Sequence, residues 1–370
     1  MTSEASSPLQ ARHLSIGYRP SKGAPYCVHP DLSFSLRAGE VTALLGANGA
    51  GKSTLLRTLA GFQSPLGGEV ILAGAPLESV KASTRARLLG VVLTERSVSG
   101  GLRVRDLVAL GRYPYTHYLG GLSSHDEAMV ERAMASVAIT HKADAFIDEL
   151  SDGERQKAMI AKVLAQECPI ILLDEPTAFL DVTNRIELMI LLRQLALEEG
   201  KAILLSTHDI ELALSLADRL WLMMNDSMRR EADAGTDTMF VGTPEELVLS
   251  GVIGRYFGRR EVMFDPLLGR LVHRATSQRP IIVQCDDEQI AYWLANALRR
   301  AGYSPQVGAL CPDASAPILA PTAADALSCS NADPTPPSIR YDAVDQNFTL
   351  LRPDHPAQSY ASISAVIAAL

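Results

Sequence analysis

The chain has 370 residues, of which 47% are hydrophobic and 21% charged, and its formal net charge is -8 at pH 7. This length accommodates one large domain or two, and the acidic balance argues against a nucleic-acid-binding surface as the main activity. The cysteines show no CxxC spacing, which predicts neither a zinc site nor a disulfide framework. The first residues lack the features of a signal peptide, and no apolar run approaches the roughly 18 residues of a membrane span. We therefore expect a cytoplasmic protein that reaches a membrane only through a partner.

The N-terminal part predicts strands that lead into a glycine-rich loop. Residues Leu14–Tyr18 and Leu32–Leu36 alternate apolar and polar side chains, which is typical of two antiparallel strands. The apolar stretch Val41–Leu45 predicts a buried strand. Tyr18 ends the first strand, and its aromatic face can stack on a flat base such as adenine. An ordinary edge-strand tyrosine is the alternative.

The glycine-rich loop reads GANGAGKST and lies between the strand Val41–Leu45 and a predicted helix, Leu55–Ala60. Strand, glycine-rich loop and helix are the context of a phosphate-binding loop. Glycines let the backbone approach a polyphosphate closely, and the N–H groups at the helix start attract the anion. Lys52 supplies positive charge to the phosphates, and the hydroxyl of Ser53 is placed to ligate Mg²⁺. The expected binding residues are Gly46, Ala47, Asn48, Gly49, Ala50, Gly51, Lys52, Ser53 and Thr54.

The next part of the chain alternates strands and helices. The pattern predicts a strand at Gly67–Leu72, a helix near Ser83–Leu89 and a buried strand, Gly90–Glu95, that ends in polar residues. From Val104 to Phe146 the pattern is largely helical, with a break around Tyr113–Leu122. This amphipathic insert is a candidate surface for a partner protein.

Two polar motifs follow the insert. The stretch LSDGERQK at Leu150–Lys157 places Ser151 as a good helix N-cap. The stretch PIILLDEP at Pro169–Pro176 is an apolar strand that ends in Asp174 and Glu175. A strand without polar alternation is buried on both faces, as in a parallel sheet. At its end, Asp174 can hold the Mg²⁺ of a bound nucleotide, and Glu175 can polarise a water molecule.

A second apolar strand also ends in polar residues. After the predicted helix Asn184–Leu197, the strand Ala202–Ser206 runs into Thr207, His208 and Asp209. A histidine just past a buried parallel strand lies on the ligand edge of an open sheet. A capping or surface role is the alternative for an isolated histidine, but the spacing from the other motifs favours the site.

The stretches GANGAGKST, LSDGERQK, IILLDEPTAFLD and STHD, in this order, resemble the ATP-binding subunit of ABC transporters over about residues 9–258. The resemblance implies an α/β P-loop ABC ATPase domain with a mixed sheet core, an antiparallel β subdomain and a helical signature subdomain. Within the family, LVALGRYPY at residues 107–115 resembles the importer ATPases for iron–siderophores, heme and cobalamin.

Such subunits hydrolyse ATP to energise uptake through an integral membrane permease, which receives its solute from a substrate-binding protein. They work as head-to-tail homodimers that close over two ATP molecules. The resemblance therefore implies ATP and Mg²⁺ as cofactors, no nucleic-acid partner, and a cytoplasmic subunit that lies peripherally on the inner face of the membrane through the permease.

The resemblance also implies roles for the residues around the phosphates. Lys52, Ser53 and Asp174 match the phosphate and Mg²⁺ ligands of the family. Glu175 matches the general base, or the carboxylate that orients the attacking water. His208 matches the switch histidine that contacts the γ-phosphate.

Four further positions match residues that contact the base or the second protomer. Tyr18 is in the place of the adenine-stacking aromatic residue. Ser151 and Gly153 match the signature residues that reach across to the ATP of the partner. Asp181 lies in the loop after the base and resembles the residue that couples the two sites.

Two departures from the family pattern concern rate and coupling more than ATP binding. The family usually has glutamine at Thr94, where it touches Mg²⁺ and the attacking water; the hydroxyl of Thr94 can ligate a metal, or Glu95 can substitute. The signature reads LSDGE rather than LSGGQ. Asp152 and Glu154 suit a helix N-terminus, and we expect both side chains to point away from the γ-phosphate.

We place a domain boundary at residue 258, so that 1–258 form the ATP-binding domain and 259–370 a hairpin with a small α/β appendage. The appendage contains no recognisable ligand constellation. A low-complexity segment at about 309–338 predicts a flexible loop. The other predicted elements are a hairpin of Glu261–Asp265 with Arg270–Arg274, a strand at Pro280–Gln284, a helix at Asp287–Ala301, a strand at Phe348–Leu351 and a terminal helix at Ser359–Leu370.

Other functions fit the sequence less well. ABC ATPases that act on DNA or ribosomes usually carry a coiled-coil insertion or a second cassette, and this sequence shows neither. A regulatory ABC ATPase that is not coupled to transport is motivated by Thr94, but Glu175 and His208 argue against a non-hydrolysing module. A GTPase would need an NKxD-type motif, and exporter ATPases are often fused to membrane spans. The transported solute does not touch this subunit, so the sequence does not name it.

Overall fold

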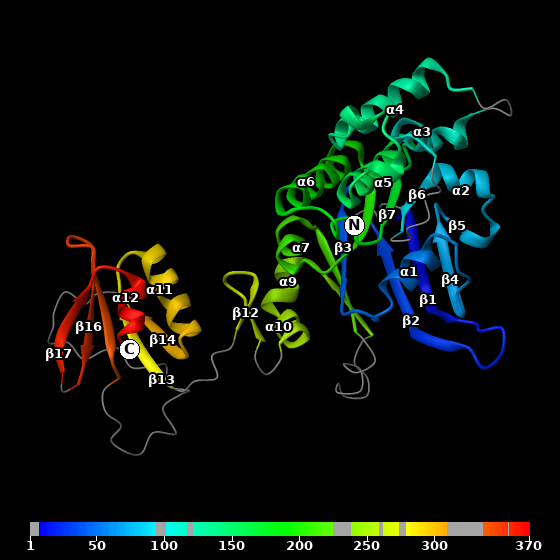
Figure 1. The fold of residues 1–370 in the computed structure, drawn as a ribbon. Helices are drawn as coiled ribbons and strands as arrows, with labels where there is room; N and C mark the ends of the chain where they lie inside the picture. The colour runs from blue at the N-terminus through cyan, green and yellow to red at the C-terminus, as the bar shows by residue number, and fades with distance from the viewer. Residues whose placement is uncertain are drawn as a thin grey trace. The chain divides into compact units, whose positions relative to one another are not determined.

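The computed structural model describes residues 7–93, 101–116, 121–224, 238–258, 262–273, 279–308, 336–353 and 355–370. The chain divides into two compact units (Figure 1). The first unit comprises residues 1–253 with 266–270, and the second comprises 254–265 with 271–370. The first unit contains two sheets and the second a five-stranded sheet, and each unit has its own buried apolar cluster.

A six-stranded sheet forms the centre of the first unit. Its strand order is β10-β9-β3-β8-β7-β6, and all neighbours run parallel except β10, which is antiparallel to β9. Every residue of β3, β7 and β8 is buried, as expected for apolar strands that have structure on both faces. The strands are β3 (Val41–Gly46), β6 (Leu89–Val92), β7 (Ile170–Leu173), β8 (Ala202–Thr207), β9 (Arg219–Met223) and β10 (Met239–Gly242).

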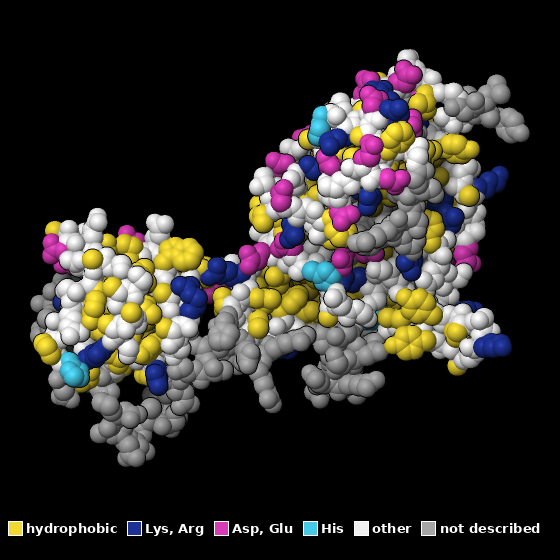
Figure 2. All heavy atoms as spheres, viewed as in Figure 1, with side chains coloured by type: hydrophobic (Ala, Val, Ile, Leu, Met, Phe, Trp, Pro, Cys, Tyr) yellow, Lys and Arg dark blue, Asp and Glu magenta, His cyan; other side chains and the backbone are white. Residues whose placement is uncertain are grey.

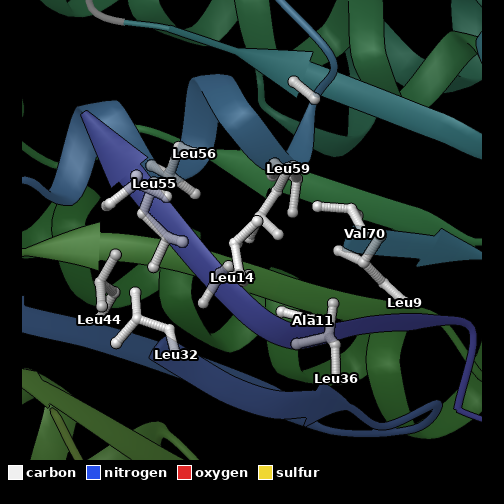
Figure 3. Packing of buried hydrophobic residues seen from close by; sticks show 14 of the residues in the cluster. Leu9, Ala11, Leu14, Leu32, Leu36, Leu44, Leu55, Leu56, Leu59 and Val70 are labelled. Carbon is white, nitrogen blue, oxygen red and sulfur yellow. The ribbon is translucent and has the colours of Figure 1, made fainter. Parts of the chain in front are cut away.

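A four-stranded antiparallel sheet with the order β2-β1-β4-β5 packs with helix α1 (Lys52–Leu59). Leu14 of one predicted strand lies opposite Leu32 of the other. Figure 3 shows Leu55, Leu56 and Leu59 of α1 among the leucines of β1 and β2. Burying this apolar surface fixes the helix that follows the glycine-rich loop. The strands are β1 (Leu9–Tyr18), β2 (Tyr26–Leu36), β4 (Gly67–Leu72) and β5 (Ala75–Pro76).

The predicted helical insert folds as a group of helices in which α3, α4 and α5 contact one another. Together with the mixed central sheet and the antiparallel sheet, this confirms the expected three-part α/β architecture. The α-helices of this unit are α1, α2 (Ala82–Leu88), α3 (Val104–Ala109), α4 (Ser124–Ser136), α5 (Asp152–Ala165), α6 (Val182–Glu199), α7 (Ile210–Leu216) and α9 (Pro244–Leu249). Short 3₁₀ turns occupy Leu77–Ser79, Leu110–Tyr115, Thr140–Lys142 and Ile147–Glu149.

The buried side chain of Arg112 connects the break in this helical insert with the C-terminal end of helix α5 through ion pairs and a hydrogen bond. The side chain of Arg112, only 3% exposed, donates to Asp126 at 2.8 Å and to Glu167 at 2.5 Å. It also donates to the carbonyl oxygen of Ala165 at 2.7 Å. Hydrogen bonds from Ser123 and then from Arg112 lower the pKa of Asp126 to about 2. The resemblance to importers rests on this LGRYPY segment, and the structure shows that its arginine is an internal anchor.

The second unit contains a five-stranded sheet with the order β14-β13-β15-β16-β17. Helices α11 and α12 contact the sheet and each other, and their apolar side chains share one buried cluster with β13, β15 and β16. Helix α10 (Val252–Phe257) and strand β12 (Arg270–His273), which pairs with β11 (Val262–Asp265), begin in residues of the first unit and end in the second. The other described elements of the second unit are β13 (Arg279–Gln284), α11 (Glu288–Arg300), β14 (Tyr303–Gly308), β15 (Ser338–Asp342), β16 (Asn347–Arg352), β17 (His355–Tyr360) and α12 (Ile363–Ala368).

The terminal helix begins later than predicted. Ser359 and Tyr360 belong to β17, where they pair with Thr349 and Phe348 of β16. The helix is α12 and begins after Ser362, whose hydroxyl caps it by accepting from the N–H of Ala365. Of the predicted flexible loop, residues 309–335 lie outside the described residues, and Ser338 begins β15.

Candidate nucleotide-binding site

The topology of the central sheet brings the sequence motifs together. Strands β3, β8, β7 and β6 are parallel neighbours in that order, so their carboxyl ends lie along one edge of the sheet. The glycine-rich loop follows β3, His208 follows β8, and Asp174 with Glu175 follows β7. This edge is where open α/β sheets bind ligands. Thr94 and Glu95 follow β6, but both lie outside the described residues.

The glycine-rich loop packs tightly against strand β2. Gly51 has a φ of 94°, and a Cβ at this position would lie 2.7 Å from Cγ1 of Val28, so only glycine fits. The next residue, Lys52, is 6% exposed. Its Nζ donates to the carbonyl oxygen of Gly46 at 2.7 Å. Burial lowers the pKa of Lys52, and the negative charges of Glu175 and Asp174 oppose that shift. The lysine charge therefore lies beside both carboxylates.

Strand β8 and the histidine that follows it hold Asp174 and Glu175 in place. The hydroxyl of Ser206 donates to Oδ1 of Asp174 at 2.7 Å and accepts from the N–H of Glu175 at 2.9 Å. Nε2 of His208 lies 2.5 Å from Oε1 of Glu175. Glu175 has a φ of 50°, a left-handed conformation that is unfavourable for a glutamate. Such strain is typical of functional sites, because surrounding structure must enforce it.

A pocket of about 340 Å³ opens over this edge of the sheet. It is lined by Tyr18, Tyr26, Val28, His29, Asn48, Gly49, Ala50, Gly51, Lys52, Ser53, Thr54 and Glu175. The hydroxyl of Tyr18 lies 2.7 Å from Oγ1 of Thr54, which ties the tyrosine to helix α1. The structure thus gathers Tyr18, most of the predicted loop residues and Glu175 around one space.

Three lining residues, Tyr26, Val28 and His29, are not among the predicted binding residues. Tyr26 pairs directly with Tyr18 in the β1–β2 hairpin, so the two side chains lie on one face. His29 is buried next to the loop, and its Nε2 lies 2.7 Å from the carbonyl oxygen of Ala50. The signal that would have found them is the pairing register of the hairpin, which the sequence alone did not define.

The oxygen donors at the site fit a magnesium ion. Mg²⁺ is usually held by one or two protein oxygen ligands together with the phosphates of its nucleotide. Ser53 lines the pocket, and the carboxylate of Asp174 influences the adjacent Lys52. Among the described residues there is no group of three histidine, cysteine, aspartate or glutamate side chains that would hold a metal on its own. The donor set suits an ion that arrives with a nucleotide.

The signature residues form a separate group that does not line this pocket. Ser151 caps helix α5, and its hydroxyl and N–H both contact Oε2 of Glu154 at 2.9 Å. Hydrogen bonds from Ser151 and Lys142 lower the pKa of Glu154 to about 2. The carboxylate of Glu154 therefore folds back on Ser151, while Asp152 pairs with Arg155 at 3.1 Å.

The loop that contains Asp181 lies beside the signature. A Cβ on Gly153 would lie 3.1 Å from the carbonyl oxygen of Phe179, two residues before Asp181. Asp181 caps helix α6 by accepting from the N–H of Asn184 at 2.8 Å. Ser151 and Gly153 thus lie at the start of helix α5, close to the loop that leads to Asp181 at the start of helix α6.

Comparison with known proteins agrees with this geometry. A family model described as "ABC transporter" matches residues 30–178. The ferric enterobactin transport ATP-binding protein FepC of Escherichia coli is 36% identical over 70% of this chain and 91% of its own length. The chain belongs to the ABC transporter ATPase family. It is therefore an ATPase.

Another relative and a solved structure are also ATP-binding proteins or parts of ABC transporters. The achromobactin transport ATP-binding protein CbrD of Dickeya dadantii is 39% identical over 59% of this chain and 79% of its own. Among solved structures, cbiO1 of Clostridium perfringens, part of the ABC transporter complex cbiONQ, superposes with a TM-score of 0.54 and 26% identity over 67% of this chain and 93% of its own.

Proposed function

We propose that this ABC ATPase is the ATP-hydrolysing subunit of an importer that takes up iron–siderophores, with heme and cobalamin as the other candidate solutes. The observation that carries the proposal is the convergence of Lys52, Asp174, Glu175 and His208 at one sheet edge beside a pocket of about 340 Å³. The relatives named for enterobactin and achromobactin transport support the solute class.

In the proposed reaction each residue at the edge has a separate task. Lys52 and the loop N–H groups neutralise the phosphates, while Ser53 and Asp174 hold the Mg²⁺ that accompanies ATP. Mg²⁺ supplies charge neutralisation on the phosphate oxygens. Glu175 orients and activates the attacking water, and His208, within hydrogen-bond distance of Glu175, contacts the γ-phosphate. Tyr18 and Tyr26 offer aromatic faces to the adenine.

We infer that two copies act together as a homodimer. Ser151 and Gly153 of one protomer would reach the γ-phosphate held by the other, and Asp181 would couple the two sites. Their grouping at the exposed starts of α5 and α6 supports this arrangement. Closure has to displace the hydroxyl of Ser151 from Glu154, which contacts it at 2.9 Å.

The permease is the proposed membrane partner, and a substrate-binding protein the indirect one. Within the described residues no helix has the length and apolarity needed to cross a bilayer. Attachment to the inner face of the membrane would then depend on the permease. Leu110 and Tyr113, beside the buried Arg112, are 48% and 73% exposed and lie in the segment that resembles importers. We place the permease contact there, with no role for nucleic acid.

Uptake by cells that lack the chain tests the proposal. Restoring the unaltered chain should restore uptake of radiolabelled iron–siderophore, whereas Lys52→Ala, expressed at the same level, should not. Labelled heme and cobalamin, measured in parallel, identify the solute class. Normal uptake of all three solutes without the chain, combined with intact ATPase activity of the purified protein, would favour the alternative of an ABC ATPase not coupled to transport.

A further inference from the structure

Strand β2 presents one buried histidine beneath the phosphate-binding loop. The buried residues of β2 are Val28, His29, Leu32 and Leu36, so His29 is the polar member of an otherwise apolar set. Its exposed fraction is 0%, and its Nε2 lies 2.7 Å from the carbonyl oxygen of Ala50. A carbonyl oxygen only accepts, so Nε2 carries the proton and donates it. Burial of a polar ring nitrogen is costly unless it is hydrogen-bonded, and this bond meets that need for Nε2.

The bond fixes the orientation of one peptide group in the loop. The described chain contains no cis peptide bonds, and in a planar trans peptide the C=O and the following N–H point in opposite directions. Because the carbonyl of Ala50 points to His29, the N–H of Gly51 points away from it. Gly51 is the residue before helix α1, where free N–H groups attract an anion.

The imidazole also leaves this peptide group little room to rotate. A Cβ on Gly51 would lie 3.3 Å from Cδ2 of His29, so the ring packs directly under the glycine. On the other side of the loop, Lys52 holds the carbonyl oxygens of Gly46 and Ala47 at 2.7 and 3.4 Å. Lys52 can exchange those contacts for phosphate, whereas His29 can keep its bond throughout.

We propose that His29 is a positioning residue of the ATPase, which locks the Ala50–Gly51 peptide so that the Gly51 N–H faces the phosphates of ATP. The inference rests on the proposed function of the pocket as an ATP site. Although His29 borders the pocket, its side chain is fully buried, so in this role it acts through the loop backbone and not by contact with the nucleotide.

Three substitutions at residue 29 separate the effect of losing the hydrogen-bond donor from the effect of changing the side-chain volume. In His29→Gln, the amide nitrogen is as many bonds from Cα as Nε2 of histidine, so it can reach the Ala50 carbonyl. His29→Asn is one bond shorter, and His29→Leu keeps an apolar side chain without a donor. His13→Asn is a matched control, because His13 is an exposed histidine of the same hairpin that pairs with Asp31.

The expected result is a loss of affinity for phosphates. His29→Leu and His29→Asn should raise the Kd for ATP and for inorganic tripolyphosphate about tenfold or more, the scale of one hydrogen bond to a charged group. His29→Gln should restore most of the affinity, and His13→Asn should change nothing. The KM for ATP should rise more than kcat falls, and the Gly51 amide resonance should shift less on addition of ATP.

A structural role alone would give a different pattern. In that case the three variants would lose thermal stability and affinity in parallel, and glutamine would not restore phosphate binding. That pattern, or wild-type affinity in His29→Leu, would overturn the inference. If the unaltered chain itself failed to bind ATP, the proposed function would fall instead, independently of His29.

Discussion

The sheets of the two units differ in how deeply their strands are buried. In the first unit the central strands β3, β7 and β8 are buried along their whole length, and the polar groups emerge only at their carboxyl ends. In the second unit β17 is exposed at almost every residue, and one apolar cluster is shared with α11 and α12. Figure 2 shows acidic and basic side chains interspersed over the helical part of the first unit, and many hydrophobic ones on the second.

The comparison separates residues that serve chemistry from residues that serve packing. The first unit contains a buried lysine beside two carboxylates and a glutamate in a left-handed conformation, both of which oppose stability. Helix α11 of the second unit follows the rules of a stable helix: Asp287 caps it, and Leu294 and Leu298 are buried on one face. We infer that ATP chemistry belongs to the first unit alone, and the following changes test that separation.

The largest effect is expected at the catalytic carboxylate. Glu175→Gln keeps the shape of the side chain but removes the charge that activates water, so ATP turnover should fall by at least about 10²-fold while ATP binding is retained. Phosphate release and equilibrium ATP binding measure the two quantities. Glu288→Gln, in the first turn of α11, is the matched change in the second unit and should leave turnover unaltered. Turnover of Glu175→Gln at the parental rate would contradict the assignment of the base.

The next effect concerns the internal anchor of the helical insert. Arg112→Met removes a buried cation and leaves the buried carboxylate of Asp126 without its cationic partner, which should cost about 3–5 kcal/mol of unfolding free energy. Urea denaturation of the first unit measures this cost. Arg105→Met is the control, because its ion pair with Glu131 is exposed and should contribute no more than about 1 kcal/mol. An equal loss of unfolding free energy in Arg112→Met and Arg105→Met would show that burial does not determine the contribution of these ion pairs.

A smaller effect is expected from a substitution in the core of the second unit, because it should lower the stability of that unit and leave ATPase activity unchanged. Leu294→Ala leaves a cavity under α11 and should destabilise that unit by about 2–5 kcal/mol, with ATPase activity unchanged. Leu267→Ala, at a side chain that is 96% exposed, should change neither quantity. Calorimetry combined with an ATPase assay measures both. A parallel loss of ATPase activity in Leu294→Ala would break the separation of the two units.

The smallest effect is a pH dependence at the signature. The pKa of Glu154 is lowered to about 2, so its carboxylate contributes stability that is complete above the ordinary value near 4.5 and is lost as the pH falls towards 2. The difference in Tm between the parent and Glu154→Gln should therefore be larger at pH 6 than at pH 3. A difference that stays constant between these two pH values would argue against the contacts with Ser151 and Lys142.

The meeting of the motifs at one edge of the central sheet could be predicted because each motif is continuous in sequence. Asp174 and His208 directly follow β7 and β8, and Lys52 follows β3 after the glycine-rich loop, so parallel pairing is enough to place these positions on one edge. Tyr26 and His29 could not be found in this way, since their places in the pocket depend on irregular pairing in the β1–β2 hairpin, which contains several register shifts. The assignment of Thr94 as a metal ligand stays a prediction.

The strands of the second unit are harder to predict because their own sequences lack the residue types and the alternation that are typical of strands. β14 contains Pro305 and ends at Gly308, and both residues are poor strand formers, although the strand pairs regularly with β13. In β17, the exposed residues His355–Tyr360 lack the alternation that marks a half-buried strand. The sequence therefore predicts a helix from Ser359, whereas α12 begins only at Ile363. In each case a neighbouring strand, rather than local sequence, determines the structure.

The left-handed backbone at Glu175 places stability and activity in direct competition at a single residue. A φ of 50° suits glycine, whereas glutamate adopts it at a cost of about 1–2 kcal/mol. Glycine at this position would relieve the strain and remove the base, so the variant that relaxes the fold is also the one that cannot turn over. Selection for a more stable protein would favour loss of this glutamate, and its retention depends on selection for ATP hydrolysis.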